Sequence, residues 1–450
     1  MRVNIGSIRA AHDADQCGVC RAAAASRWME LDTDLVIVGA GPAGLSLAIA
    51  AAGAGLRATV VEQQAVEAVE RPADDGREIA LTHRARRIME SLGTWARLPR
   101  DVIAPLREAR VLDGESSDAL RFPPPAGADE ALGWLVPNHC IRAAALAAAR
   151  EHPGIRLVFG QRVAALQTGA ARAGVTLQDG STLCAPLVVG ADSRLSSVRR
   201  LAGIGASMHD FGRSVVAGRV AHAADHGGIA WECFRYGNTL ALLPLNDRQC
   251  SAVVTVAADQ APAWLGLSDE AFAARVQAQC GGRLGPLTAI GTRHHYPLVG
   301  VYAHRFAGPR FALVGDAAVG MHPVTAHGFN FGLYGVEVLV RELQCARRGG
   351  IDIGAPEVLQ RYEAEHRRAT LPIYLGTNAL VSLFTDDRGP ARLARRAVLA
   401  VAGHAPVLGG LIKAAVARQL TGGRAPHPVP AARRGWRAPG ETTRGPATST

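Results

Sequence analysis

Near the start of this 450-residue chain, apolar residues are arranged first as in a strand, then as in a helix, and then again as in a strand. Residues 34–38 form an apolar run typical of a buried strand, residues 43–54 have the repeat of a helix, and residues 58–62 are again strand-like. A strand, a helix and a second strand in this order make a βαβ unit, in which the two strands are parallel. This part of the chain therefore predicts an α/β fold.

The pattern changes along the rest of the chain. Residues 79–92 and 139–150 have the repeat of helices, whereas the region from about 212 to 300 is rich in strand-like runs. Residues 357 to about 420 are again helical, apart from a break at 386–390. We therefore predict a sheet domain inserted between segments of an α/β domain. Individual strands are predicted at residues 155–159, 174–177, 186–189, 239–243 and 251–256.

A glycine-rich turn, residues 39–44, joins the first predicted strand to the first helix. Gly39 allows the tight bend, Gly41 lets a pyrophosphate approach the backbone, and Gly44 lets the helix pack on the strand. Glu62 lies 21 residues after Gly41, where an acidic side chain binds a ribose in such units. These features predict a dinucleotide site, and they do not distinguish FAD from NAD.

A second turn of this kind occurs more than 270 residues later. Gly315 and Asp316 follow the apolar run 311–314, and a loop then leads to a helical run from Leu333. An acid at a strand's end can bind a ribose or ribitol hydroxyl, and free N–H groups at a helix start can bind an anionic ring or a phosphate. Two such turns indicate one long cofactor held at both ends; the alternative is an ordinary strand–loop–helix connection.

Between these turns, the apolar run 187–190 places Asp192 at a third turn, which is followed by Arg194 and Arg199. This segment either contributes to the cofactor site or caps the start of a helix, since both produce the same pattern.

In order and spacing, the three segments resemble the single-component FAD-dependent aromatic hydroxylases. Among these, the chain is most similar to the hydroxylases of ubiquinone biosynthesis, over roughly residues 32 to 420. Further matches lie at residues 75–77, 133–138, 241–245, 361–368 and 378–384.

The resemblance implies an α/β, Rossmann-like FAD-binding fold of the p-hydroxybenzoate hydroxylase type, with an interleaved mixed β-sheet substrate domain and C-terminal helices. We expect residues 31–105, 135–205 and 300–375 to form the FAD-binding domain. Residues 106–134 and 206–299 are expected to form the substrate-binding sheet domain.

Both ends of the chain match none of these elements. Residues 1–30 are predicted to be a disordered extension, or Met29 is the natural start. Residues 376–420 are expected to form a C-terminal helical segment. Residues 421–450, rich in Pro, Gly, Arg and Thr, are predicted to be a disordered tail.

The resemblance implies FAD as the bound cofactor and NAD(P)H as a co-substrate. The first turn would hold the ADP part, the middle motif would lie near the pyrophosphate and the nicotinamide route, and the last turn would hold the ribitol and flavin. Backbone N–H groups of residues 328–330 are expected at the pyrimidine edge of the flavin. The predicted FAD-binding residues are Gly39, Gly41, Ala43, Gly44, Glu62, Gln63, Arg77, Arg142, Asp192, Gly315, Asp316, Gly328, Phe329 and Asn330.

The resemblance also implies the reaction: NAD(P)H reduces the flavin, O2 reacts with it, and an electrophilic oxygen is delivered to an electron-rich ring. Pro323 is expected beside the substrate ring. His327 is a candidate acid–base group, because histidine titrates near neutrality, or else a packed turn residue. Trp231, Phe234 and Tyr236 either line an apolar substrate pocket or are core aromatics.

Three positions depart from the pattern of this family. Ser193 stands where the family commonly has glycine, Val319 where it commonly has histidine, and His327 where it often has glutamine. The last two are expected near the flavin, so they bear on the position of the substrate rather than on the cofactor.

The expected substrate is an aromatic small molecule, a polyprenylated phenol precursor of ubiquinone, hydroxylated as by a 5-demethoxyubiquinol hydroxylase. Three alternatives remain: a hydroxylase of another aromatic metabolite, a flavin reductase of the isoprenoid-saturating type, and a NAD-dependent dehydrogenase without flavin. The oligomeric state stays open.

Composition adds limits on partners and location. The net charge of +10 comes mostly from arginine, and no basic stripe interleaved with aromatics indicates a nucleic-acid partner. Eight scattered cysteines indicate a reduced cytoplasmic compartment, with Cys17 and Cys20 as an alternative redox or metal pair; no metal site is predicted. Residues 393–420, apolar and basic, either contact the inner membrane or a biosynthetic complex peripherally or pack on the cofactor domain.

Overall fold

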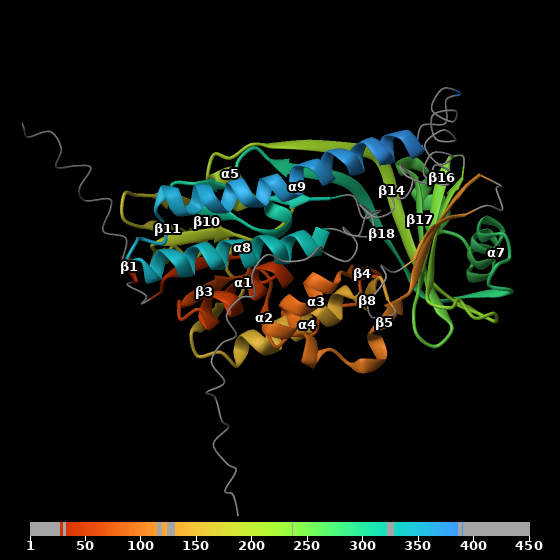
Figure 1. The fold of residues 1–450 in the computed structure, drawn as a ribbon, viewed down its shortest axis with the longest axis horizontal. Coiled ribbons are helices and arrows are strands. Elements are labelled where there is room, and N and C mark those ends of the chain that lie inside the picture. The colour runs from red at the N-terminus through yellow and green to blue at the C-terminus, as the bar shows by residue number, and fades with distance from the viewer. Residues whose placement is uncertain are drawn as a thin grey trace, which may run out of the picture.

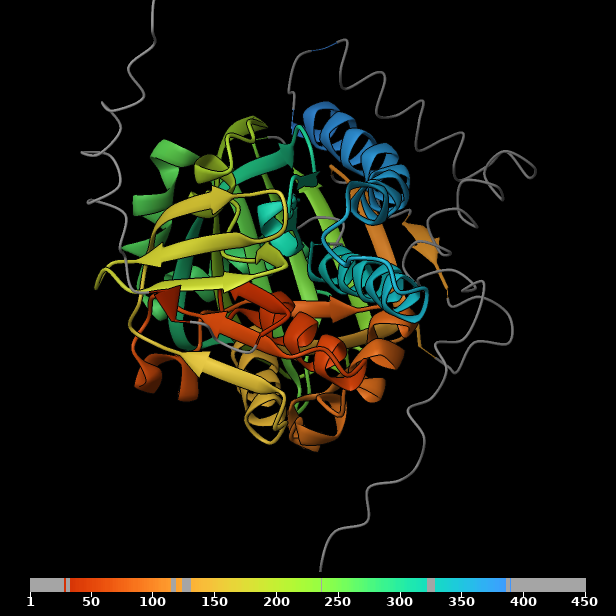
Figure 2. The ribbon, with the colours of Figure 1, turned by 90° about the vertical axis from the view of Figure 1, so that its left-hand side faces the viewer.

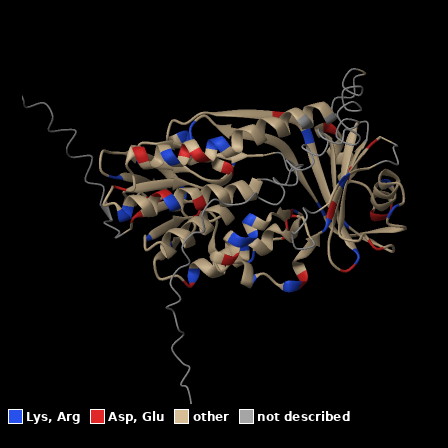
Figure 3. Cartoon of the chain, viewed as in Figure 1, with Lys and Arg blue, Asp and Glu red and all other residues tan. Residues whose placement is uncertain are grey.

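The computed structural model describes residues 28–29, 33–114, 119–123, 131–235, 237–321, 328–385 and 389. Figure 1 shows an elongated molecule in which an α/β part and a large sheet lie side by side. Acidic and basic residues are interspersed over the elements seen in Figure 3. No helix among the described residues is both long and apolar enough to cross a membrane.

A six-stranded sheet forms the centre of the α/β part. Its strands follow the order β19-β20-β13-β2-β3-β9, and all neighbours are parallel except the edge pair β19–β20. Every residue of β2, β3, β13 and β20 is buried, as expected for a parallel sheet covered on both faces. The bounds are β2 Leu35–Val38, β3 Ala58–Val61, β9 Ile155–Val158, β13 Leu187–Gly190, β19 Ala307–Gly308 and β20 Phe311–Leu313.

Helices and a second, four-stranded sheet share one apolar core with these strands. Figure 2 faces this end of the molecule, with the four-stranded sheet in yellow above the parallel sheet. The helices are α1 Pro42–Gly53, α2 Val66–Glu70, α4 Asn138–Arg150, α5 Ser197–Leu201, α8 Gly328–Arg348 and α9 Pro356–Thr385. The strands of the second sheet are β1 Trp28–Met29, β10 Val163–Thr168, β11 Ala173–Leu177 and β12 Thr182–Ala185.

An eight-stranded mixed sheet forms the other half of the molecule. Its order is β21-β18-β14-β17-β16-β15-β6-β7. Helices α6 (Ala261–Leu265) and α7 (Asp269–Cys280) cover one face, and the α/β part lies toward the other (Figure 1). The strands are β6 Glu108–Asp113, β7 Leu120–Phe122, β14 Ala206–His222, β15 Ile229–Arg235, β16 Asn238–Pro244, β17 Gln249–Ala257, β18 Leu287–Ala303 and β21 Val319–Gly320.

A small three-stranded sheet lies where the two halves meet. It consists of β4 (Glu78–Leu81), β8 (Gly133–Pro137) and β5 (Ala104–Leu106), and α3 (His83–Ser91) packs beside it. The predicted helix over residues 79–92 is therefore wrong in its first part. Residues 78–81 pair with β8, and the helix starts only after Thr82, whose hydroxyl accepts the N–H of Ala85 at 3.1 Å.

The other predicted strands and helices of the α/β part are found within one or two residues of their expected starts, except α8, which starts at Gly328 and not at Leu333. Four expected domain boundaries fall inside elements. They are 105/106 in β5, 134/135 in β8, 299/300 in β18 and 375/376 in α9. Residues 28–29, expected in a disordered extension, pair with β12. The rest of residues 1–30, including Cys17 and Cys20, lies outside the described residues, as do almost all of residues 386–450.

Candidate active site

The turn between β2 and α1 is so tight that only glycine fits at two of its positions. Gly39 has a φ of +111°, and a Cβ there would lie 2.5 Å from the carbonyl oxygen of Ala191. A Cβ on Gly44 would lie 2.0 Å from the carbonyl oxygen of Gly39. At Gly41, by contrast, a Cβ would have no described atom within 4 Å. The turn is closed toward the protein and open at the N-terminus of α1.

Glu62, directly after β3, closes the same turn with its carboxylate. Its Oε2 accepts the N–H of Ala40 at 2.8 Å and its Oε1 accepts the N–H of Gln64 at 2.9 Å. A carboxylate can accept about four hydrogen bonds, so Glu62 retains the capacity to bind a ribose hydroxyl. Gln63 beside it is exposed. Arg142 on α4 reaches the same corner, where its Nη2 donates to Oε1 of Gln64 at 3.2 Å.

The two turns that lie far apart in sequence are neighbours in the structure. Gly315 has a φ of +61°, and a Cβ there would lie 2.8 Å from the Cβ of Ala43 on α1. A Cβ on Gly332 in α8 would lie 3.4 Å from the Cα of Gly315. These close approaches bring α1, the turn after β20 and the start of α8 together at one place. The expectation of one ligand held by both turns therefore agrees with the geometry.

The middle motif, residues 192–199, supports the turn after β20 through hydrogen bonds and an ion pair. Oδ2 of Asp192 accepts the N–H groups of Ser197 at 2.8 Å and Val198 at 3.3 Å, so this oxygen caps α5. Arg199 on α5 is buried and donates to the carbonyl oxygen of Ala317 at 2.9 Å. Asp316, beside Ala317, lies 3.6 Å from the guanidinium of Arg194. Asp192 therefore caps a helix, which was one of the two roles expected for it. Arg194 and Arg199 connect this motif to the turn after β20.

Arg77 lies in the loop before β4, between the α/β part and the large sheet. Oδ2 of Asp75 accepts hydrogen bonds from Nη2 of Arg77 at 2.5 Å and from Nδ2 of Asn138 at 2.7 Å. Burial raises the pKa of the Asp75 carboxyl, but the hydrogen bond and charge of Arg77 outweigh burial, and the pKa is lowered overall. The guanidinium of Arg77 lies 5.6 Å from the ring centre of Tyr296 on β18.

The first turn of α8 is anchored by Asn330. Its Oδ1 accepts the N–H of Thr82 at 3.0 Å, and its Nδ2 donates to the carbonyl oxygen of Ala80 at 2.8 Å. Phe329 packs against the apolar cluster around α3. The side chains of these two residues thus hold α8 in place, and residues 328–330 form the first turn of this helix.

Pro323, His327 and Tyr236 lie outside the described residues. The structure does not bring the other two predicted substrate residues together, because strand neighbours alternate between faces. Trp231 packs with the cluster under α7, with Arg110 and Arg283 over its ring, whereas Phe234 lies on the opposite face of β15.

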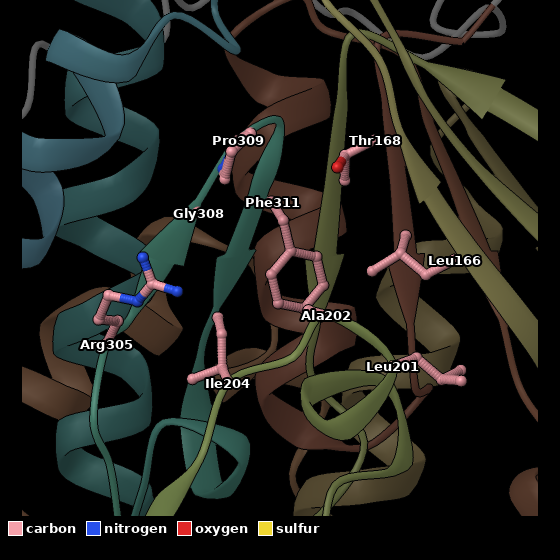
Figure 4. Close-up of a pocket in the computed structure, with 9 residues that line it drawn as sticks. All are labelled: Leu166, Thr168, Leu201, Ala202, Ile204, Arg305, Gly308, Pro309 and Phe311. Atoms are coloured by element: carbon pink, nitrogen blue, oxygen red, sulfur yellow. The ribbon is translucent and has the colours of Figure 1, made fainter.

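A pocket of about 90 Å³ lies elsewhere, beside β10 and β20 (Figure 4). Leu166, Leu201, Ile204 and Phe311 are among its lining residues, and none of the predicted site residues lines it. It therefore does not mark the cofactor site.

Two acidic residues at the junction were missed from the sequence. Glu78 on β4, almost fully buried, pairs with Arg219 on β14 at 2.8 Å. Glu232 lies within β15, and burial raises the pKa of its carboxyl to about 7. The available signal was an acid inside an otherwise apolar strand.

A glycine turn at a helix start, an acid after the second strand and a second turn against the same helix fit one elongated dinucleotide cofactor. The chain belongs to the family described as FAD binding domain, whose model matches residues 32–371. It is thus a member of the FAD-dependent monooxygenases, which confirms the expected cofactor and class of enzyme.

Within this family, the chain is similar in sequence to hydroxylases named for ubiquinone. The chain is 43% identical over 399 residues to ubiquinone hydroxylase UbiM of Neisseria meningitidis, an alignment that covers 88% of this chain and 86% of the relative. It is 38% identical to ubiquinone hydroxylase UbiL of Rhodospirillum rubrum, covering 81% and 84% of the two chains. The 3-demethoxyubiquinol 3-hydroxylase of Escherichia coli is 29% identical, covering 84% and 96%.

Solved structures confirm the expected fold. PqsL of Pseudomonas aeruginosa, a probable FAD-dependent monooxygenase, superposes with a TM-score of 0.68 at 22% identity, covering 79% of this chain and 97% of PqsL. The p-nitrophenol 4-monooxygenase PnpA of Pseudomonas putida also gives 0.68, at 19% identity, covering 87% and 99%.

Proposed function

We propose that this protein hydroxylates the aromatic ring of a polyprenylated phenol in ubiquinone biosynthesis, with FAD as cofactor and NAD(P)H and O2 as co-substrates. The observation that carries the proposal is the 43% identity to ubiquinone hydroxylase UbiM across 88% of this chain. The net reaction replaces a ring hydrogen by a hydroxyl group, consumes O2, NAD(P)H and a proton, and releases water and NAD(P)⁺.

The residues of the first turn fit the ADP part of FAD. The open side of Gly41 faces the N-terminus of α1, whose free N–H groups and helix dipole favour a pyrophosphate. Glu62 would accept a ribose hydroxyl, with Gln63 and Arg142 beside it. Gly39, Ala43 and Gly44 keep this turn narrow enough for such an approach.

The second turn fits the other end of the cofactor. Gly315 and Asp316 would contact the ribitol, and the N–H groups of residues 328–330 would meet the pyrimidine edge of the flavin. Asp192 and Arg77 would support this end from the middle motif and the loop before β4. When bound, the flavin supplies the activation of O2 that no amino-acid side chain provides.

The protein's own part in the reaction is to bind and orient the ring and to keep water away from the reacting atoms. We assign Pro323 to a position beside the substrate ring and His327 to acid–base work, on the strength of the family pattern. The substrate would lie between the flavin end of the cofactor and the large sheet, with Phe234 and Tyr236 as lining candidates. A polyprenyl chain resides in the membrane, so we also propose a peripheral contact with the inner membrane from the cytoplasmic side.

Deletion of the gene tests the proposal. We expect the ubiquinone level to fall and a prenylated phenolic intermediate to accumulate, and the mass of that intermediate identifies the ring position that is hydroxylated. Reintroduction of the wild-type gene is the control and should restore the quinone. Unchanged quinone with no phenolic intermediate would contradict the proposal.

A measurement on the purified enzyme separates hydroxylation from flavin reduction alone. The yellow holoenzyme should oxidise NAD(P)H faster when a prenylated phenol is present, and the phenol should gain one oxygen atom. Saturation of the prenyl chain without oxygen consumption would instead identify a reductase of the same fold.

A further inference from the structure

The two faces of the eight-stranded sheet are covered very differently. On the face under α7, Leu240, Leu242, Ala252 and Val254 are between 0% and 1% exposed and pack with Phe272 of that helix. This outer face is a sealed apolar core.

The opposite face is turned toward the α/β part. Tyr296 lies under Arg77, and Arg219 pairs with Glu78, so both of these sheet residues contact the loop before β4 or β4 itself. Strand register places a continuous row of side chains on this inner face, because residues paired across neighbouring strands point to the same side. The row consists of His294 on β18, Ala217 on β14, Val253 on β17, Ala241 on β16 and Glu232 on β15.

Small apolar side chains make up the middle of this row, and all but Ala217 are incompletely covered. Val253 and Ala241 are only half-buried, as is Leu243 beside them, although they face the interior of the molecule. A face that points inward and yet stays accessible leaves space for an apolar ligand. Glu232 comes next in the row, before Val111 on β6. It is also half-buried, and among the described residues no hydrogen bond is found at its carboxylate.

We infer that Glu232 binds the phenolic hydroxyl group of the aromatic substrate and accepts its proton, while Ala241 and Val253 lie beneath the ring. This inference rests on the proposed function and names a residue that recognises the substrate. A half-buried carboxylate on an apolar face is stabilised by a hydrogen-bond donor, and a phenol supplies one at the edge of an apolar ring.

The proton transfer explains how the ring is made reactive. The phenolic O–H bond breaks, the proton moves to a carboxylate oxygen of Glu232, and the electron pair stays on the substrate as a phenolate. The negative charge of the phenolate enriches the ring carbons ortho and para to its oxygen. One of these carbons would form a bond to one oxygen atom of O2, which the bound reduced flavin would activate, and the other oxygen atom would leave as water. When that carbon loses its hydrogen as a proton, the ring becomes aromatic again, and Glu232 returns its proton to the phenolate oxygen.

The environment of Glu232 suits a base. Burial raises the pKa of its carboxyl to about 7, so it is ionised and able to accept a proton above that pH and protonated below it. Asp113 on the neighbouring strand β6 lies on the same face. The other charged or titratable side chains on this face of the described sheet are Arg213, Arg219, His294 and Tyr296, and those approaching from the α/β part are Asp74, Arg77 and Glu78.

The test uses the FAD-loaded enzyme and 2-prenylphenol as a probe. Binding to the oxidised wild-type holoenzyme at pH 8, without NAD(P)H, should produce the ultraviolet difference spectrum of a phenolate, and Glu232→Gln should abolish it. In turnover, Glu232→Gln should lower kcat/KM by about 100-fold or more, the usual range for a lost general base. The wild-type kcat/KM should fall as the pH drops through about 7, and this limb should be missing in the variant.

Glu270→Gln is the matched control, since it makes the same charge change at an exposed position on α7, behind the sheet. It should keep the phenolate spectrum and the activity of the wild type. Glu232→Gln should retain FAD and unfold no more easily than the wild type at pH 8, because it removes a buried charge. Should that variant fail to fold, the wild-type pH profile and phenolate spectrum still decide the matter.

A wild-type enzyme that binds the phenol without a phenolate spectrum, or a folded Glu232→Gln enzyme with unchanged kcat/KM, overturns the inference. A wild-type enzyme that forms the phenolate but hydroxylates no phenol refutes the proposed function instead and leaves the binding role of Glu232 intact.

Discussion

The two turns that we propose as the two ends of the FAD site meet at Ala43, but different contacts hold them in shape. The first turn owes its shape to missing side chains, because a Cβ at Gly39 or Gly44 would lie within 2.5 Å of a carbonyl oxygen. The turn after β20 also requires a glycine, Gly315, but it is held in addition by Arg199 of α5, which donates to the carbonyl oxygen of Ala317. The start of the neighbouring helix α8 is held by Asn330, which accepts the N–H of Thr82. The proposed nucleotide end therefore depends on close approaches of the backbone, and the proposed flavin end on hydrogen bonds between residues far apart in the sequence.

This difference determines which changes each end tolerates. At the proposed nucleotide end, an added methyl group should lower the free energy of unfolding. At the proposed flavin end, the loss of a polar group should do so. Substitutions in each turn, each compared with a control substitution elsewhere, can therefore test this difference.

Gly44→Ala should have the largest effect. The new Cβ would lie 2.0 Å from the carbonyl oxygen of Gly39, so α1 has to move away from β2, at a cost of at least about 3 kcal/mol in the free energy of unfolding. Urea unfolding and the FAD content of the purified protein measure the result. Gly53→Ala in the same helix is the control, since a Cβ there meets no described atom within 4 Å. Equal stability of the two variants would show that the turn can relax.

Asn330→Ala should destabilise the flavin end. It leaves the buried N–H of Thr82 and the carbonyl oxygen of Ala80 without this partner, and each loss costs about 1.5 kcal/mol, so a decrease of about 3 kcal/mol is expected. Thermal and urea unfolding provide the measurement. Gln360→Ala, an exposed amide on α9, should change stability by less than about 0.5 kcal/mol. A wild-type melting curve for Asn330→Ala would mean that α8 is held by packing alone.

The flavin end should also be the acid-sensitive one. His366 on α9 is buried next to α8, and its Nδ1 lies 3.0 Å from Oη of Tyr362, which donates to the carbonyl oxygen of Leu313 on β20. Burial lowers the pKa of His366 to about 4, so its neutral form stabilises the fold above about pH 6.5. That stability is lost as the pH falls toward 4, by roughly 3 kcal/mol.

Urea unfolding between pH 7.5 and 4.5 tests this expectation. His366→Gln keeps a polar group beside Tyr362 but lacks the titration, so its free energy of unfolding should decrease less than that of the wild type over this range. Parallel pH profiles for the two proteins would exclude His366 as the cause of acid sensitivity.

The smallest effect on stability is expected at Gly41, in the turn that is otherwise the most sensitive. Its φ of −71° and ψ of 173° suit alanine, and a Cβ there would have no described atom within 4 Å. Gly41→Ala should thus unfold within about 0.5 kcal/mol of the wild type. FAD affinity, measured by titration of the apoprotein, should still fall, because the methyl group occupies the approach to the pyrophosphate. An unchanged FAD affinity would place the cofactor elsewhere.

The same contrast explains what could be predicted from the sequence. The shape of the first turn could be predicted because Gly39, Gly41, Gly44 and Glu62 lie within one βαβ unit, where spacing alone fixes their relative places. The partners of Asn330 lie 248 and 250 residues away, and no local pattern relates them.

The misassigned elements have equally physical causes. Residues 79–81 have helical spacing, yet pairing with β8 makes them a strand, so a tertiary contact overrides the local repeat. Trp231 and Phe234 were grouped by residue type, although an odd separation along a strand puts them on opposite faces. The same alternation, applied to β15, would have drawn attention to Glu232.

The two longest strands have a mechanical consequence. β14 and β18 have 17 residues each, roughly 56 Å when extended, and pass from the α/β part into the substrate sheet. β18 also pairs with β21, which begins at Val319, just after the turn that would hold the flavin. A rotation that separated the two halves as rigid bodies would break this ladder. We therefore expect a long, flexible substrate to enter through small local movements of the chain and not through separation of the two halves. The sheet that aligns the ring with the cofactor would then keep the same structure from one turnover to the next.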